Sequence, residues 1–337
     1  MSKIKRRNFL KAAGASAAVL QSASMLAASA KTSAGLAPPE VPGATKFPKL
    51  CIITPYTPEK LRFAGAAGYE GVVVTHGPTF NPDLSDSQID QILAAARDAG
   101  VRIISIECMG GFNHIAGDAA QRAATQAKFV RCIEFAHHLG CKFVGTLSGG
   151  MHGAKVDDMV KLFADAVNEQ YMPVCEKLDM KIGWENYPAP FNFATIPAIW
   201  EKIFALVPNP RFGLEFDPSH FVRQYIDPIS TAWHFQSRIH AVHAKDTEIT
   251  QPVLQQVGIH GDGWWRYRIP GQGLINWPAF ITVLLQAGFA GGIAVEHEDE
   301  FWDKRGTENE ADFPQERKDG FILAQRFLTM YLPGRQA

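Results

Sequence analysis

Four side chains that can bind a metal ion stand at the ends of short apolar runs in the second half of the chain. They close the segments 182–185, 213–217, 239–243 and 293–296, and they are Glu185, Asp217, His243 and Glu296. Three carboxylates and an imidazole directed at one axis repel one another unless a cation lies between them. Carboxylate-rich surroundings suit Mn²⁺, Mg²⁺ or Co²⁺ better than a structural zinc. A single acid at a strand end more often caps a helix or pairs with Lys or Arg, but four such residues in succession favour a divalent-cation site.

The hydrophobic pattern indicates the elements that must bring these side chains together. Eight short apolar runs predict strands, and segments of helical periodicity, such as 119–139 and 156–178, separate them. The predicted strands are Leu50–Thr54, Gly71–Thr75, Arg102–Ile106, Lys142–Thr146, Lys181–Trp184, Phe212–Phe216, Ile239–Val242 and Gly292–Val295. Strands that alternate with helices predict a parallel sheet, either an open doubly wound sheet or a closed barrel.

Two features favour a single-domain (β/α)₈ TIM barrel over residues 47–335. The strands number eight, and their spacing is that of one domain of barrel size. No GxGxxG sequence follows the first strand, where a dinucleotide-binding fold requires it. Residues just after the strands of such a barrel lie at its catalytic end, which gives the four possible ligands a common location.

Two further polar residues are expected at the same end. His76 follows the second predicted strand and Glu107 the third. Each could contact a substrate, and each could equally serve as a structural hydrogen-bond partner.

The connection 247–276 is long for a compact domain, and loops of this length are usually functional or disordered. Within it, Trp265 could stack on a sugar ring, while Arg266 and Arg268 could bind sugar oxygens. The alternative is that Trp264 and Trp265 fasten the loop to the barrel.

The four strand ends, together with the His-Ala-Lys-Asp run at 243–246, resemble the xylose isomerase-like barrel superfamily of sugar isomerases and epimerases. The similarity is greatest to the branch of ketose 3-epimerases, hydroxypyruvate isomerase and inosose-processing enzymes. The intervals between the first three ligands fit this branch, as does the segment 270–273 ahead of Trp277. His220, in Asp-Pro-Ser-His, matches a position that lines the family's active site. The resemblance covers roughly residues 48–332, with specific motifs in the second half and generic ones in the first.

The chain departs from the simple ketose epimerases in three places. The interval from His243 to Glu296 is longer, because of the Trp-Trp-Arg-Tyr-Arg segment. The position of their substrate-contacting glutamate holds Phe191, and the position of their arginine holds Ile249. The substrate therefore does not carry over from them. Similar chains occur among exported or oxidoreductase-linked sugar enzymes, and some of these eliminate or hydrolyse 3-keto-glycosides.

The resemblance implies a metal-dependent enzyme that moves a proton beside a sugar carbonyl through a metal-stabilised enediolate. The implied cofactor is one Mn²⁺ ion, with Mg²⁺, Co²⁺ or Zn²⁺ as alternatives. Glu185 and Glu296 would exchange protons with the two faces of the substrate, and His220 would orient it or donate a proton. Lys245 and Asp246 would position sugar hydroxyls, unless they form a salt bridge within the strand-end loop.

Three other functions fit parts of the same pattern. A lyase or hydrolase of 3-keto-glycosides would begin with the same proton abstraction and then expel a leaving group. An abasic-site endonuclease on this barrel would need three zinc ions, more histidines and a basic face. A non-catalytic sugar-binding protein would have no need of a base on either side of the metal. The full ligand set therefore favours an enzyme that acts on a small-molecule sugar or keto-sugar.

Residues 1–30 predict a twin-arginine signal peptide. The pair Arg6-Arg7 precedes an apolar, alanine-rich stretch that ends in Ala28-Ser29-Ala30, a pattern typical of signal peptidase cleavage. The segment 31–46, with three prolines, predicts a linker. We therefore expect a periplasmic protein that is exported folded and has no stable membrane insertion after cleavage. Assembly into a homo-oligomer stays open.

Net charge and cysteine spacing argue against a nucleic-acid-binding protein and against a zinc–thiolate protein. Five of the 33 basic residues and none of the 34 acidic residues lie within residues 1–30, so the mature chain has 28 basic residues and a net charge of −6. This balance argues against nucleic acid as a partner, because such binding relies on Lys and Arg at phosphates. The five cysteines form no CxxC pair, which argues against a zinc–thiolate site and favours buried thiols for most of them.

Overall fold

The structure is a computed structural model that describes residues 47–303 and 313–333. The predicted signal peptide, residues 1–30, and the predicted linker, residues 31–46, lie outside the described residues and stay predictions. Across the two described ranges, no helix combines the length and the apolar character needed to cross a bilayer.

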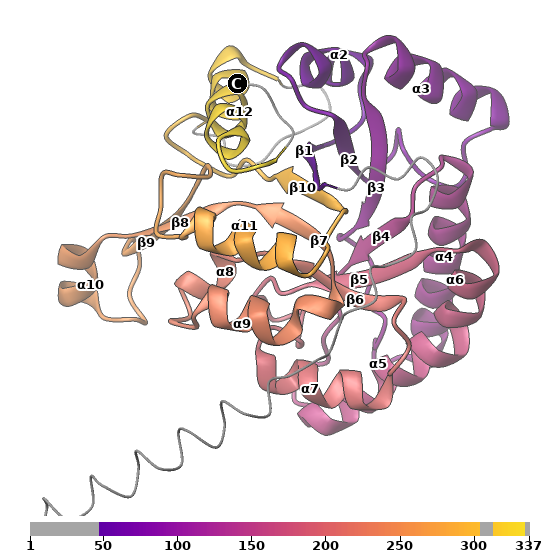
Figure 1. The fold of residues 1–337 in the computed structure, drawn as a ribbon. Coiled ribbons are helices and arrows are strands. Elements are labelled where there is room, and N and C mark those ends of the chain that lie inside the picture. Colours follow the sequence, from indigo (N-terminus) through magenta and orange to yellow (C-terminus); the bar gives the residue numbers. More distant parts are fainter. Residues whose placement is uncertain (1–46, 304–312, 334–337) are drawn as a thin grey trace, which may run out of the picture. The chain divides into compact units, whose positions relative to one another are not determined.

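Eight parallel strands close into a barrel in the order β1-β10-β7-β6-β5-β4-β3-β2 (Figure 1). They are β1 (Lys49–Thr54), β2 (Gly71–Thr75), β3 (Arg102–Cys108), β4 (Phe143–Thr146), β5 (Lys181–Glu185), β6 (Phe212–Phe216), β7 (Ile239–Ala244) and β10 (Gly292–Val295). The prediction of a TIM barrel is confirmed. Each predicted strand overlaps an observed one, and their ends differ by two residues or fewer.

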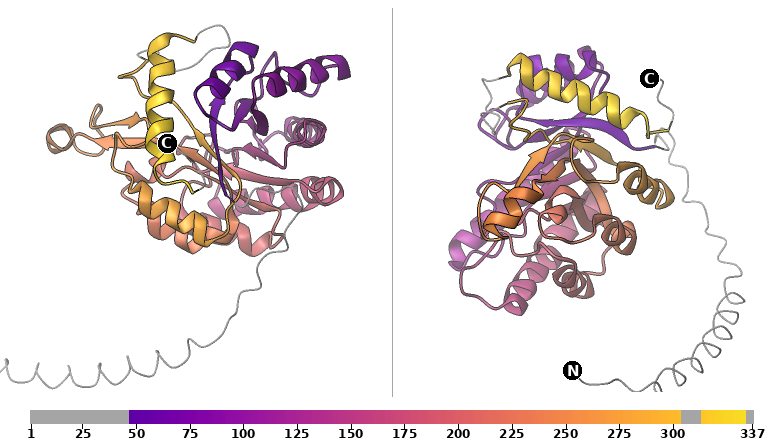
Figure 2. Two further views of the ribbon diagram at one scale, coloured as in Figure 1. Left: turned by 45° about the horizontal axis from the view of Figure 1, so that its top comes forward. Right: turned by 90° about the vertical axis from the view of Figure 1, so that its left-hand side faces the viewer.

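Helices cover the outside of the barrel (Figure 2). They are α2 (Pro58–Ala66), α3 (Asp86–Asp98), α4 (Ala119–His138), α5 (Val156–Ala166), α6 (Met172–Leu178), α7 (Pro197–Leu206), α8 (Ser219–Val222), α9 (Pro228–Phe235), α11 (Trp277–Gln286) and α12 (Gln315–Thr329). Ser85 and Gln88 form a capping box that starts α3. The last helix, α12, returns to the beginning of the barrel, where the Tyr69 hydroxyl donates to the Phe321 carbonyl.

The segment 156–178, predicted as one helix, is divided into three parts. A π-helical turn, η2 (Val167–Tyr171), separates α5 from α6. Pro173 explains the interruption, because proline lacks a backbone N–H and its ring clashes with the preceding turn of a regular helix. The wider turn accommodates this residue without ending the helical path.

The long connection after β7 contains a second, two-stranded sheet. Its strands, β8 (Asp246–Ile249) and β9 (Trp265–Arg268), pair in antiparallel fashion, and α10 (Gln251–Val257) lies between them. We call the segment 246–268 the hairpin. Its outer end with α10 projects from the barrel at the left of Figure 1, while its base adjoins the carboxyl end of the strands. A short 3₁₀ turn, η3 (Gln236–Arg238), precedes β7.

Strand and helix side chains share one large apolar core. Trp184 and Phe212 are buried on neighbouring strands and stack with ring centroids 5.0 Å apart. All five cysteines are buried and none forms a disulfide, as predicted for most of them.

Candidate active site

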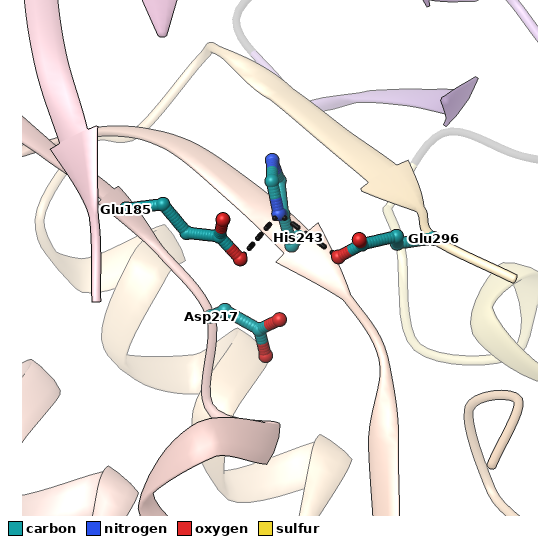
Figure 3. Close-up of side chains that lie close together, drawn as sticks. All are labelled: Glu185, Asp217, His243 and Glu296. Atoms are coloured by element: carbon teal, nitrogen blue, oxygen red, sulfur yellow. Dashed lines mark hydrogen bonds and ion pairs between the residues drawn. The ribbon is translucent and has the colours of Figure 1, made fainter. Parts of the chain in front are cut away.

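The four predicted metal ligands lie together at the carboxyl end of the barrel (Figure 3). Glu185 ends β5, His243 lies in β7, and Asp217 and Glu296 directly follow β6 and β10. Glu185 Oε1 and Glu296 Oε2 approach His243 Nδ1 from opposite sides, each at 3.1 Å. One donor atom from each of the four residues lies within 4.8 Å of the other three.

Strand register produces this convergence. Glu185 is paired with Glu215 across β5 and β6, and His243 is paired with Ala294 across β7 and β10. Neighbouring parallel strands therefore finish at similar heights, and the residues that follow them share one rim. Asp217 is held further by Asn186, whose side chain accepts from the Asp217 N–H at 2.9 Å and donates to its carbonyl at 2.8 Å.

His220 lies against two of these ligands. Its Nε2 is 3.0 Å from Glu185 Oε1 and 3.2 Å from Asp217 Oδ2, and its side chain is fully buried. On the other side of the ring, Nδ1 lies 2.8 Å from the hydroxyl of Tyr267. Tyr267, contributed by β9, escaped the sequence analysis. Only the pairing of the hairpin brings this residue, 47 positions away, to His220.

A buried ammonium group offsets part of the negative charge of the cluster. Lys245 Nζ lies 2.8 Å from Glu296 Oε2, 2.9 Å from Glu298 Oε2 and 3.3 Å from Asp217 Oδ2. Its side chain is 1% exposed, and Nζ lies 4.4 Å from the centre of the Tyr267 ring. Lys245 therefore interacts with carboxylates and is not a free donor to sugar hydroxyls in this state. Glu298 was not predicted, although its position two residues after Glu296 was a usable signal.

At the buried acids and lysine of the site, nearby opposite charges shift the pKa values further than burial does, and in the opposite direction. Burial alone would raise the pKa of Glu185, but His243 and His220 hold that pKa well below its ordinary value. Burial would also raise the pKa of Glu296, but the nearby Lys245 ammonium outweighs this effect and lowers the pKa to about 2. Desolvation would lower the pKa of Lys245, but the surrounding carboxylates raise it well above its ordinary value. Both glutamates and the lysine are therefore charged at neutral pH.

A cavity of about 490 Å³ opens over the cluster. Its wall includes the predicted residues Glu185, Lys245 and Glu296 and several that the sequence analysis did not single out for this role, which are Met109, Gly110, Gly111, Phe112, Asn113, Leu147, Tyr187, Phe191 and Glu298. The lining combines charged side chains with aromatic rings, and this combination suits a polyhydroxylated ring with one apolar face.

The structure places the other two strand-end residues elsewhere. Glu107 is 3% exposed and lies on the far side of His243, with Oε1 2.9 Å from Nε2. His76 lines an adjacent hollow of about 500 Å³, which shares Gly110 with the cavity above the ligands and is also lined by Asn81, Lys128 and Arg131. Neither residue is part of the wall of the cavity above the four ligands.

The predicted contacts from the hairpin have partners within the protein. Arg266 Nε bonds Glu248 at 2.7 Å, and Arg268 bonds both Glu248 and Asp299. The Trp265 ring carries the guanidinium of Arg223 at 4.2 Å from its centre. These residues therefore stabilise the hairpin and its attachment to the barrel.

Asp246 also bonds to its own loop. Its two oxygens accept four hydrogen bonds, which come from Thr247 N, Gly271 N, Ile275 N and Trp277 Nε1. The side chain is fully buried, so its oxygens hold the segment 270–277 against β8.

The donor set of the cluster fits a divalent cation. Asp217 Oδ2 is buried and accepts no hydrogen bond from the described residues, and its contacts with His220 Nε2 and Lys245 Nζ are ion pairs of 3.2 and 3.3 Å. Three carboxylates and one imidazole are donors that Mn²⁺ and related ions accept. The buried cluster could therefore hold a metal ion through Glu185, Asp217, His243 and Glu296.

A closed parallel barrel whose carboxyl rim carries an acidic cluster with one histidine defines a known class of protein. The chain belongs to the xylose isomerase-like TIM barrel family, whose model matches residues 61–318. An inosose dehydratase from Lacticaseibacillus casei is 24% identical over 190 residues, which are 52% of this chain and 63% of that protein. The chain spans between 40% and 63% of the length of the curated relatives that it matches.

Solved structures share the fold across nearly the whole barrel. L-ribulose 3-epimerase superposes with a TM-score of 0.64 at 16% identity and covers 84% of this chain and 94% of its own. The 3-keto-D-glucoside 4-epimerase from E. coli gives 0.62 at 13% identity, covering 83% and 99%. At such identities the likeness concerns the fold alone.

Proposed function

We propose that this chain is a metal-dependent sugar isomerase or epimerase that moves a proton beside a carbonyl group. The observation that carries the proposal is the pair of carboxylates on opposite sides of His243. Glu185 and Glu296 are each 3.1 Å from Nδ1 and line the same cavity. Two bases that face one substrate from two sides suit the removal of a proton on one face and its return on the other.

In the proposed reaction, Glu185 and Glu296 transfer the protons, and neighbouring residues orient them and keep them ionised. A divalent cation held by the cluster supplies Lewis acidity that makes the proton next to the carbonyl easier to remove. Glu185 takes or returns a proton at one face, and His220, held by Tyr267, orients its carboxylate. Glu296 serves the other face and is kept ionised by Lys245. The aromatic wall excludes water from the reacting carbon.

One observation favours a second activity, elimination or hydrolysis of a 3-keto-glycoside. Glu298 adds a third carboxylate to the cavity wall, outside the proposed ligand set, and pairs with Lys245 at 2.9 Å. A leaving group beside the carbonyl needs a proton donor of its own, and Glu298 is placed to supply it. The names of the relatives, inosose dehydratase and 3-keto-D-glucoside 4-epimerase, support both reactions on this fold.

Metal analysis of the native protein tests the proposal together with two variants. We expect one divalent ion per chain, and its loss in Glu185→Gln and Glu296→Gln because each removes a charged ligand. Sugar turnover should fall by about 10²–10⁴-fold in both, the range for loss of an acid–base group. The exposed Glu201→Gln is the matched control. Unchanged metal content and turnover in both ligand variants would contradict the proposed site.

A product assay separates the two reactions. The native protein is incubated with a keto-sugar and with a keto-sugar glycoside, in each case with Mn²⁺. A new stereoisomer from the first substrate supports epimerisation, and release of the aglycone from the second supports cleavage. Equal sugar binding with and without metal, and no product from either substrate, would favour a binding protein.

We also propose that the chain is exported to the periplasm by the twin-arginine route, as its first 30 residues indicate. Replacement of both Arg6 and Arg7 by Lys should leave the uncleaved chain in the cytoplasmic fraction. Cell fractionation and immunoblotting measure this outcome. Unaltered appearance of a shortened chain in the periplasm would refute the proposed route.

A further inference from the structure

Two buried acids lie behind His243, on the side away from the cavity. Glu107 Oε1 is 2.9 Å and Glu215 Oε1 is 3.3 Å from His243 Nε2. Glu107 is the penultimate residue of β3 and Glu215 lies in β6, and they are 3% and 1% exposed. The opposite ring nitrogen, Nδ1, faces Glu185 and Glu296. The imidazole thus lies between two pairs of carboxylates, one in the cavity and one inside the barrel.

Glu107 and Glu215, which we call the inner pair, both contact the same side chain, His243. Among the described residues, every ion pair of Glu107 and Glu215 is made with His243. His243 Nε2, Glu107 Oε1 and Glu215 Oε2 form no well-aligned hydrogen bond in that part of the chain, so the inner pair contacts Nε2 as ion pairs. A buried carboxylate without a polar partner is costly, so this placement points to a specific task for the pair.

A glycine on the adjacent strand makes room for one of these acids. A β-carbon at Gly145 in β4 would lie 2.0 Å from Glu215 Oε2, closer than any real contact. Gly145 is also the strand partner of Glu107 in the barrel. The interior of the barrel is therefore built around the inner pair at three strands, β3, β4 and β6.

We propose that Glu107 and Glu215 are positioning residues that hold His243 through Nε2 and so present its Nδ1 to the metal ion. The inference rests on the cation site proposed above. A ligating histidine needs its second nitrogen fixed, because that contact sets both the orientation of the ring and the nitrogen that carries the proton. With the proton kept on Nε2, Nδ1 offers its lone pair toward Glu185, Asp217 and Glu296.

Equilibrium titration of the metal-free full chain with MnCl₂ tests the inference without any substrate. Glu107→Gln and Glu215→Gln should each weaken Mn²⁺ binding by about 10–100-fold, the usual cost of losing such an outer contact, while one ion still binds per chain. The matched control is Thr146→Val, which removes a buried hydroxyl that bonds His114 and not His243. This control should retain the affinity of the native protein.

Gly145→Ala perturbs the same contact and leaves both acids in the sequence. Its methyl group displaces the Glu215 carboxylate, so we expect a loss of Mn²⁺ affinity similar to that of Glu215→Gln. Circular dichroism establishes that the variant is folded. The two Gln variants preserve side-chain shape and keep the test valid if the Ala variant does not fold.

A spectroscopic measurement distinguishes positioning from a general structural role. In ¹⁵N NMR of histidine-labelled, metal-free protein, the Nε2–H group of His243 should give a slowly exchanging signal. That signal should broaden or shift in both Gln variants and persist in Thr146→Val. Native Mn²⁺ affinity in both Gln variants would overturn the inference, as would two bound ions in the native protein with one lost in each variant. Absence of any ion from the native protein would instead overturn the proposed function.

Discussion

Lys245 shows how one residue can make an acidic cluster stable before any cation arrives. Its ammonium lies within 3.3 Å of three carboxylates, and its side chain is almost fully buried. Without the lysine, three carboxylates so close together would repel one another, because like charges oppose ionisation. Lys245 thereby keeps Glu296 ionised and ready to act as a ligand or a base.

Replacement of this lysine should destabilise the metal-free protein more than the metal-loaded protein. Lys245→Met leaves buried carboxylates uncompensated, and we expect the metal-free protein to lose about 3–5 kcal/mol of unfolding free energy. Saturating Mn²⁺ should restore part of that loss, since a bound ion stabilises the folded state. Urea denaturation measures both states. The control is Lys161→Met, which removes an exposed ion pair with Asp165 and should change stability by no more than about 0.5 kcal/mol.

The side chains of the cluster were predictable from the sequence, because each of them occupies the end of a strand and the strands could be located. Glu185, Asp217, His243 and Glu296 each follow an apolar run, and a barrel brings such positions to one rim. Tyr267 could not be located this way, since its contact with His220 depends on the pairing of the hairpin. Asp246 gave no sign that its oxygens would bond to backbone amides more than 20 residues later.

At the scale of elements, the hairpin is fastened at its base through Asp246. This single buried carboxylate accepts hydrogen bonds from the loop 270–277 and so fixes the entry into α11. Burial raises the pKa of Asp246, against the lowering effect of these amide donors. The hairpin in turn delivers Tyr267 to the active-site histidine, so a loop contact outside the cavity bears on the geometry within it.

Asp246→Asn should reveal this structural role. An amide group brings two N–H donors to a place where four donors already converge, and we expect a loss of about 1–3 kcal/mol in unfolding free energy. Mn²⁺ affinity should stay within twofold of the native value, because the metal ligands lie elsewhere. Denaturant unfolding and Mn²⁺ titration measure the two quantities. Exposed Asp262→Asn, near the outer end of the hairpin, is the control, and equal stability of both variants would refute the role.

The strands of the barrel could be predicted more accurately than the hairpin or the interrupted helix. Strands were located within two residues, since a short apolar run in a parallel barrel is buried on both faces and stands out clearly. The connection 247–276 appeared structureless because β9 is largely half exposed and alternates aromatic residues with arginine, and because β8 has only four residues. Pro173 indicates the break in the segment 156–178, but the helical periodicity on both sides of it led to the prediction of one continuous helix.

For the whole molecule, buried histidines link stability to pH. Burial lowers the pKa of His114 to about 3, and its ring contacts Tyr171 and Thr146 instead of water. In the unfolded chain a histidine gains its proton near pH 6.5. The unfolded state therefore binds more protons between about pH 6.5 and 3, and stability falls as pH decreases through this range.

His114→Gln isolates this contribution. Glutamine can retain a hydrogen bond but gains no proton, so the decline of unfolding free energy with acid should be shallower by up to about 1.4 kcal/mol per pH unit. Urea unfolding at pH 7, 6 and 5 gives the slopes. The exposed His152→Gln is expected to follow the native slope. If His114→Gln followed it too, the proposed linkage would be incorrect.

The five buried thiols make the opening of different parts of the barrel measurable by alkylation. Burial raises the pKa of both Cys141 and Cys175 to about 12, and neither thiol is exposed to reagents in the folded state. Alkylation can proceed only when the surrounding structure opens. Alkylation of Cys51 in β1 and of Cys175 in α6 would then report the opening of this strand and of this helix as separate rates, which mass spectrometry can follow together.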